Sequence, residues 1–204
     1  MKEHPFVAQF ERLRALINLG REERFLEYKE SRSWNELKGK IAKTVMGMAN
    51  IRDGGTIIVG VDQRSGHPTP GGMSQSHVDT YNADDVQAYV NRFAYPYVWL
   101  ELDVVPDDYK DFVAITIYEF DQIPVVCKRN SGTLLRRGAI YTRCNRIPET
   151  CDVQSQTEMR EIVDLATDKG VRRFLERSQR AGLSLEEAIR GSDSERFEQQ
   201  LGNL

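Results

Sequence analysis

The chain has 204 residues and a formal net charge of −3, with 40% hydrophobic and 29% charged residues, a composition typical of a globular protein with one sizeable core. The mildly negative charge excludes binding of nucleic acid through overall charge, so any such contact must come from a local basic patch. No apolar run approaches the roughly 20 residues that a membrane helix needs, and the N-terminus is unlike a secretory signal, so we expect a cytoplasmic protein that makes no membrane contact.

The first elements are predicted from apolar periodicity. Apolar side chains recur at helical spacing over residues 6–18, and a glycine follows them, which predicts a helix. Residues 24–30 then alternate in polarity, which predicts a short strand with Glu27 and Lys29 on the same face.

A second helix and a central strand follow. Ser33 and Glu36 have the spacing of a capping box, which predicts the start of a helix that ends near Asn50. Gly54-Gly55 predicts a turn. The run over 56–61 is apolar on both faces, which is typical of a strand covered on each side.

The remainder of the chain begins with a long loop. Residues 63–80 are rich in glycine, proline and serine, and long loops in compact domains are often functional. The other predicted elements are a helix that begins at 82 or 83 and carries a buried stripe to 93, strands over 98–105, 112–118, 125–128 and 139–143, and helices over roughly 155–167, 170–180 and 184–201.

The sequence lacks the motifs of common nucleotide-binding and zinc sites. Neither a P-loop nor a G-x-G-x-x-G fingerprint is present, so no nucleotide cofactor is expected. The cysteines lack a C-x-x-C pair and the three histidines are scattered, which argues against zinc. We expect the cysteines to be reduced and partly buried; they are Cys127, Cys144 and Cys151.

Three carboxylates could form a metal site if the two predicted strands pair. Glu22 precedes the first predicted strand, Glu27 lies within it, and Asp62 ends the central strand. Mg²⁺ or Mn²⁺ takes oxygen ligands from two or three such acids, and Lys29 could stabilise developing charge beside them. The alternative is that Glu27 lies on a solvated face and Asp62 caps a turn.

A basic segment lies further along the chain. Residues 128–146 contain six basic residues and no acid, and an aromatic ring lies among them. Such groups commonly contact nucleic-acid phosphates, although a solvated hairpin is the alternative. The candidate nucleic-acid-binding residues are Lys128, Arg129, Arg136, Arg137, Tyr141, Arg143 and Arg146.

The segment from Glu22 to Arg143 resembles the Schlafen-type AlbA domain family. Glu27-Tyr28-Lys29 is similar to its E-[FY]-K element, and the stretch from Ala49 to Asp62 is similar to its A-N-x-x-G-G-x-[IVL]-x-[IVL]-G-V-D element. Weaker similarities are found at Ile123-Pro124 and in the strand from Gly138 to Arg143, where the family has a Y-x-R element. The chain departs from the family after Arg143, where Cys144-Asn145-Arg146 replaces glycine and small residues.

The resemblance implies an α+β fold: a small mixed, mostly antiparallel sheet flanked by helices, with a helical C-terminal extension. It divides the chain into an N-terminal helix over 1–20, the family domain over 21–152 and the extension over 153–204. In vertebrate Schlafen proteins two such lobes form a basic clamp that cleaves transfer and ribosomal RNA with two glutamates and an aspartate. The resemblance assigns these roles to Glu22, Glu27 and Asp62, and with one lobe encoded it implies a homodimeric clamp.

Two further functions stay open beside a metal-dependent endoribonuclease that prefers RNA to DNA. The chain could be a non-catalytic DNA- or RNA-binding module, such as a transcriptional regulator. It could also be a partner-binding subunit of a defence or toxin system that uses its C-terminal helices as the interface.

Overall fold

The computed structural model of the chain describes residues 5–63 and 67–182, and the chain divides after Val163 into two compact units. None of the described helices is both long and apolar enough to cross a membrane. The predicted domain boundaries after residues 20 and 152 stay predictions.

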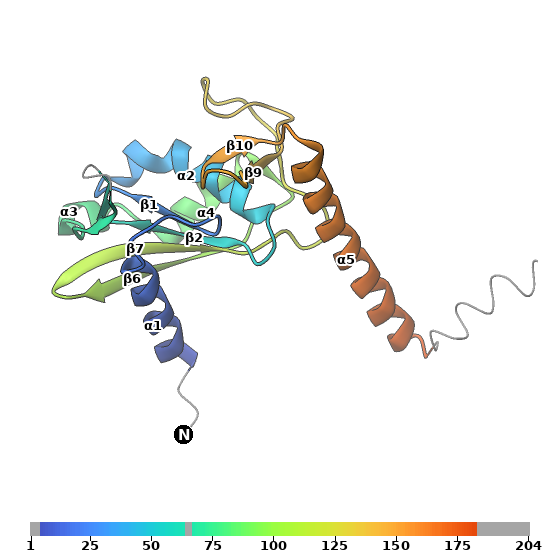
Figure 1. Ribbon diagram of the computed structural model, residues 1–204, viewed down its shortest axis with the longest axis horizontal. Helices are drawn as coiled ribbons and strands as arrows, with labels where there is room; N and C mark the ends of the chain where they lie inside the picture. Colours follow the sequence, from blue (N-terminus) through green and yellow to red (C-terminus); the bar gives the residue numbers. More distant parts are fainter. Residues whose placement is uncertain (1–4, 64–66, 183–204) are drawn as a thin grey trace, which may run out of the picture. The chain divides into compact units, whose positions relative to one another are not determined.

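The main sheet has four strands in the order β1-β2-β7-β6 (Figure 1). The β1–α2–β2 unit makes the one parallel pair of this sheet, and the β2–β7 and β7–β6 pairs are antiparallel. The predicted mixed, mostly antiparallel sheet flanked by helices is therefore confirmed. The elements of the sheet and its long helices are α1 (Pro5–Ile17), β1 (Leu26–Lys29), α2 (Trp34–Ala49), β2 (Gly55–Val59), α4 (Ala83–Asn91), β6 (Leu100–Asp107) and β7 (Lys110–Ile117).

In the part of the chain that the structure describes, three two-stranded pairs lie outside the main sheet. They join β3 to β4, β5 to β8 and β9 to β10, all antiparallel. The remaining elements are β3 (Val61–Asp62), β4 (Thr69–Pro70), α3 (Gln75–Val78), β5 (Ala94–Tyr95), β8 (Val126–Cys127), β9 (Tyr141–Arg143), β10 (Thr150–Asp152) and α5 (Gln156–Arg180).

Helices α1 and α2 lie on opposite faces of the main sheet (Figure 1). Leu13 and Ile17 of α1 pack in one core cluster with Leu26 and Tyr28 of β1. Because side chains alternate across a strand, Glu27 points to the other face, toward α2. The two faces predicted for this strand are thus the ones observed.

The turn into β2 requires a glycine. Gly54 has φ +67°, and a Cβ at this position would lie 2.0 Å from the carbonyl oxygen of Ile117. Only a residue without a side chain permits that approach in a left-handed conformation. This contact sets the start of the central strand against β7.

Two sequence predictions for the cysteines and the C-terminal helices differ from the structure. Cys144 and Cys151 form a disulfide rather than two thiols, because the β9–β10 pairing brings them together, whereas Cys127 is free and buried as expected. The helices predicted over 155–167 and 170–180 form one helix, since a single interior glycine costs only about 1 kcal/mol. The helix predicted over 184–201 lies outside the described residues.

The loop predicted over 63–80 also contains regular structure. Within its described part, β4 pairs with β3 and the short helix α3 follows. Residues 64–66 lie outside the described residues. Part of the segment that was predicted to be a loop therefore pairs with β3, which follows the central strand β2.

Asn50 joins the end of α2 to two distant segments. Its Nδ2 donates to the carbonyl oxygens of Val125 and Tyr141, both at 2.8 Å, and its Oδ1 accepts from the Val125 N–H at 2.7 Å. The residue is 1% exposed, so water cannot replace these bonds.

We predict that Asn50→Asp lowers the free energy of unfolding by about 3 kcal/mol, because a carboxylate cannot donate to either carbonyl. Urea denaturation followed by circular dichroism measures the change. The control is Asn35→Asp on the exposed first turn of α2, for which we expect a change within about 0.5 kcal/mol. Equal stability of both variants would contradict a structural role for the Asn50 amide.

Candidate functional site: a lysine-lined cleft over a buried ion pair

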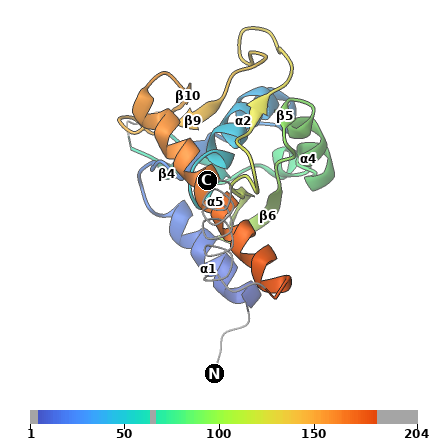
Figure 2. The same cartoon turned by 90° about the vertical axis from the view of Figure 1, so that its right-hand side faces the viewer.

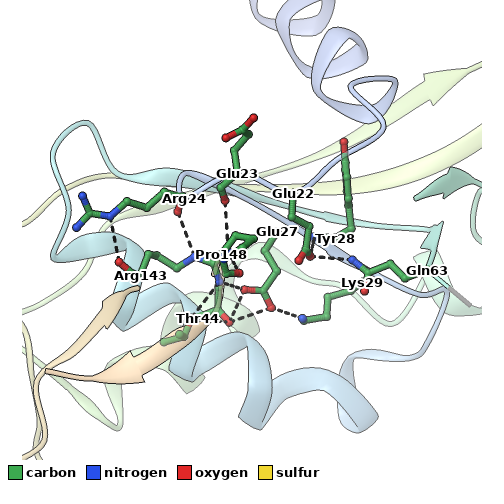
Figure 3. A network of polar contacts seen from close by, with 11 residues as sticks. Glu22, Glu23, Arg24, Glu27, Tyr28, Lys29, Thr44, Gln63, Arg143 and Pro148 are labelled. Atoms are coloured by element: carbon green, nitrogen blue, oxygen red, sulfur yellow. Dashed lines mark hydrogen bonds and ion pairs between the residues drawn. The ribbon is translucent and has the colours of Figure 1, made fainter. Parts of the chain in front are cut away.

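Glu27 lies at the centre of a buried polar network on the α2 face of the sheet (Figure 3). The residue is 7% exposed. One carboxylate oxygen pairs with the Lys29 ammonium and the other with Nη1 of Arg143. The hydroxyl of Thr44 on α2 donates to the same carboxylate at 3.2–3.3 Å.

Arg143 is entirely buried, and each of its N–H donors has an acceptor. Nε donates to the carbonyl oxygen of Arg24, and Nη1 donates to Glu27 and to the Thr150 hydroxyl. Nη2 donates to the carbonyl oxygens of Glu23 and Pro148. A guanidinium has five N–H donors, so this one is saturated inside the protein.

The segment before β1 is held to β9 from both sides. Arg24 donates from Nε to the carbonyl oxygen of Arg143 at 3.0 Å, which reciprocates the bond from Arg143 to Arg24. Arg24 also pairs with Glu161. Arg24 and Arg143 thereby join residues 23–24 to strand β9, more than a hundred residues later.

Glu22 lies near Glu27 but has different partners. Its Oε1 accepts from the backbone N–H of Tyr28 and from Nε2 of Gln63, both at 2.8 Å. Burial raises the pKa of the neighbouring Tyr28 phenol. That ring points to the α1 face, where its hydroxyl donates to the carbonyl oxygen of Leu16. The Glu22 carboxylate thus bonds to the third residue of β1 and to the residue after β3.

Glu22, Glu27 and Lys29 line one cleft of about 450 Å³. Lys40 and Lys43 enter it from α2, where they are one turn apart and so lie on the same helix face. Lys43 lies 5.2 Å from the centre of the Tyr141 ring. The other residues that line the cleft are Thr44, Gln63, Leu134, Pro148, Glu149 and Thr150.

Asp62 lines a different cleft. Strand β2 ends at Val59, Gly60 has φ +112°, and Asp62 then pairs with Thr69 in the β3–β4 ribbon. The residue faces a space of about 490 Å³ that is also lined by Glu30 and His77. The structure therefore brings Glu22, Glu27 and Lys29 together and leaves Asp62 outside their cleft.

In this structure the carboxylates of Glu22 and Glu27 line one cleft and that of Asp62 lines another. Among the described residues, the one group of three metal-ligating side chains whose atoms lie within 4.8 Å of one another is Cys144, Cys151 and Glu158. Its two sulfurs are joined in the disulfide, and hard cations prefer oxygen ligands. Both oxygens of Glu27 pair with cations, so a metal ion would compete with Lys29 and Arg143 for this carboxylate.

The basic segment divides between the interior and the surface. Arg143 and Tyr141 are buried, so neither can contact a phosphate from solvent, contrary to the prediction for these two residues. Burial raises the pKa of Tyr141, whose neutral hydroxyl accepts from the backbone N–H of Arg136. The other five are exposed: Lys128, Arg129, Arg136, Arg137 and Arg146.

A family model for the Schlafen AlbA_2 domain matches residues 22–147. The chain belongs to this family. The match begins at Glu22 and includes both Glu27 and Arg143, so the whole buried network except its Pro148 and Thr150 contacts falls inside the Schlafen AlbA_2 domain. Two of the three motif residues of the first strand, Glu27 and Lys29, line the cleft.

Two solved structures are similar to parts of the chain. One is the DIP2311 protein from Corynebacterium diphtheriae, with 17% identity and a TM-score of 0.48; the likeness covers 76% of this chain and 27% of that one. The other is the N-terminal domain of a RecG-related, ATP-dependent DNA helicase-type protein from Nitrosomonas europaea, with 22% identity and a TM-score of 0.42, covering 64% and 92%. No curated protein is similar enough to count as a match.

Sequence reasoning missed the lysines of α2 and the wall made by 148–150. Lys40 and Lys43 have the i, i+3 spacing of one helix face, which was a usable signal. That spacing alone does not distinguish a cleft from a solvated surface. The wall at 148–150 depends on where β10 packs, for which the sequence has no local signal.

We predict that Arg143→Met lowers the free energy of unfolding by about 3–5 kcal/mol, because it leaves the Glu27 carboxylate buried with one cation fewer. Arg137→Met, on the exposed loop, should change it by less than about 0.5 kcal/mol. Chemical denaturation measures both.

A double-mutant cycle tests whether the two side chains act together. We expect Glu27→Gln/Arg143→Met to cost less than the sum of the single substitutions, since the second change removes a charge that the first left unpaired. Strict additivity would contradict the buried pair as the source of the effect.

Proposed function

We propose that this Schlafen AlbA_2 domain binds nucleic acid, with the phosphate backbone in the lysine-lined cleft. The observation that carries the proposal is that Lys29, Lys40 and Lys43 converge on one cleft from a strand and a helix. Lys40 makes no hydrogen bond or ion pair with any residue in the described ranges, so its ammonium is available to a ligand. Ammonium groups of this kind bind phosphates as point charges.

The exposed basic loop supports the same proposal. The segment from Lys128 to Arg137 follows β8, and Leu134 within it lines the cleft. The loop projects beyond the neighbouring elements in both views (Figures 1 and 2). A backbone seated in the cleft would therefore have further cations beside it, which is how a protein of net charge −3 obtains a local basic surface.

We predict that Lys40→Ala/Lys43→Ala weakens binding of labelled single-stranded RNA and makes it less dependent on salt. The slope of log K against log salt should fall by about 0.7 for each phosphate that the variant no longer binds. Fluorescence anisotropy at several KCl concentrations measures both quantities.

The matched control is Lys110→Ala, which removes an exposed lysine that donates to the Pro70 carbonyl and does not line the cleft. We expect its affinity and slope to equal those of the wild type. Equal affinities for the cleft variant and the wild type would contradict the proposal.

Metal-dependent cleavage of structured RNA such as transfer RNA is the second proposed function. It is favoured by the position of Glu22 and Glu27 in the cleft that Lys29 also lines. The resemblance adds Asp62 as the third carboxylate and Mg²⁺ or Mn²⁺ as the ion. Preference for RNA over DNA and assembly into a homodimeric clamp are parts of this proposal.

We predict that the wild type cleaves transfer RNA in Mn²⁺ and that Glu22→Gln, Glu27→Gln and Asp62→Asn each reduce the rate at least tenfold. Glu149→Gln, which removes another carboxylate of the same cleft, should cleave at the wild-type rate. Gel analysis of cleavage is paired with anisotropy on the same samples. Intact RNA in the presence of wild-type protein that binds it would reject the nuclease and retain the binding domain.

The proposed homodimer and the proposed preference for RNA are tested by two separate measurements. Light scattering on the full chain, with and without RNA, gives the mass of the species that binds. Competition between unlabelled RNA and DNA of one sequence gives the preference. A monomer that binds both equally would reject these two parts alone.

A further inference from the structure

The segment from Tyr95 to Trp99 presents three aromatic rings to solvent. Tyr95 is 62% exposed, Tyr97 51% and Trp99 66%. The rings of Tyr97 and Trp99 are 4.8 Å apart between centroids, at 59° to one another. Large aromatic side chains are highly buried on average, and an exposed group of them commonly marks a binding surface.

These rings stand on a backbone that helix α4 holds firmly. Val98, between Tyr97 and Trp99, is 3% exposed, and its N–H and carbonyl bond to the side chain of Asn91 at 2.8 and 3.0 Å. Gln87 donates to the same carbonyl and accepts from the N–H of Leu100. The buried Val98 forces its two neighbours outward, and the amide contacts fix that orientation before any ligand arrives.

A cation lies on the same support. The Lys128 ammonium donates to the carbonyl oxygen of Asn91 at 2.7 Å, and the Lys128 N–H donates to the carbonyl of Phe93. Strand β5, which contains Tyr95, pairs with β8 just before Lys128. The nearest acid along the strand, Glu101, is engaged with the Tyr118 hydroxyl. Lys128 therefore places a cation on the same support as the rings.

The basic loop links this surface to the lysine-lined cleft. It begins at Lys128, beside the aromatic segment, and Leu134 in its middle lines the cleft. Figure 2 shows β5 beside the base of this loop. The loop therefore runs from the strand that pairs with β5 to the cleft.

We propose that Tyr95, Tyr97 and Trp99 form a stacking platform for unpaired bases of single-stranded nucleic acid. This inference rests on the proposed nucleic-acid binding and adds the part of the ligand that the platform recognises. Aromatic rings beside a basic track bind single strands because every base has a face that stacks on an aromatic ring, without regard to sequence. Duplexes keep their bases stacked inside and cannot use such rings.

Tryptophan emission provides a direct test, because the chain has two tryptophans and the other, Trp34, is 7% exposed. We expect a single-stranded oligouridine to quench the emission of the wild type and of Trp34→Phe alike. A duplex RNA of equal length should leave the emission unchanged. Unchanged emission with oligouridine bound at saturation would overturn the platform.

Affinity provides the second arm. Trp99→Ala and Tyr97→Ala should each weaken oligouridine binding about 5- to 150-fold, while duplex binding changes less than twofold. The control is Tyr109→Asn, which removes a more exposed ring from the β6–β7 turn and tolerates its positive φ. Thermal unfolding of each variant establishes that it is folded.

The two proposals fail in different ways. If the platform variants bind oligouridine as tightly as the wild type while Lys40→Ala/Lys43→Ala binds weakly, the platform is rejected and the nucleic-acid-binding function stands. If the wild type binds neither oligouridine nor duplex, both are rejected.

Discussion

The structure around the cleft depends on one buried charge, the Glu27 carboxylate. An ionised carboxylate inside a protein is costly unless cations and hydrogen bonds surround it. Here Arg143, Lys29 and Thr44 supply them from β9, β1 and α2. Because the guanidinium also bonds to the carbonyls of Glu23 and Pro148, three stretches that are distant in sequence are fixed at one point: 23–29, α2 and 143–148.

That network explains how a hairpin outside the main sheet keeps its place. Strands β9 and β10 share no ladder with the four-stranded sheet, so no backbone pairing anchors them there. Arg143 anchors them through the carboxylate, and Gly47 of α2 lets the hairpin approach closely. A Cβ on Gly47 would lie 2.7 Å from the Thr150 methyl group and 3.3 Å from the Thr142 carbonyl oxygen. The wall of the cleft at 148–150 follows from this anchoring.

Local patterns predicted most of the fold, and long-range pairing accounts for the errors. The alternating polarity of residues 24–30 predicted the two faces of β1, and the capping box predicted the start of α2 correctly. Arg143 was grouped with surface cations because its partner is 116 residues away and no local pattern distinguishes the two. Asp62 leaves the sheet because Gly60, at φ +112°, turns the chain after β2. A positive φ at a glycine is a tertiary outcome that the sequence permits without requiring.

In the acid-free segment, the number of basic residues and their positions in the structure lead to different conclusions. Six basic residues lie between 128 and 146, but one is engaged by a buried carboxylate and Arg136 pairs with Asp152. What remains on the surface is a loop with cations at both ends. One end lies beside exposed aromatic rings and its middle beside the lysines of α2. Since screening limits exposed charges to about 10 Å at 0.1 M salt, this local arrangement, rather than the net charge of −3, sets the field that a ligand meets.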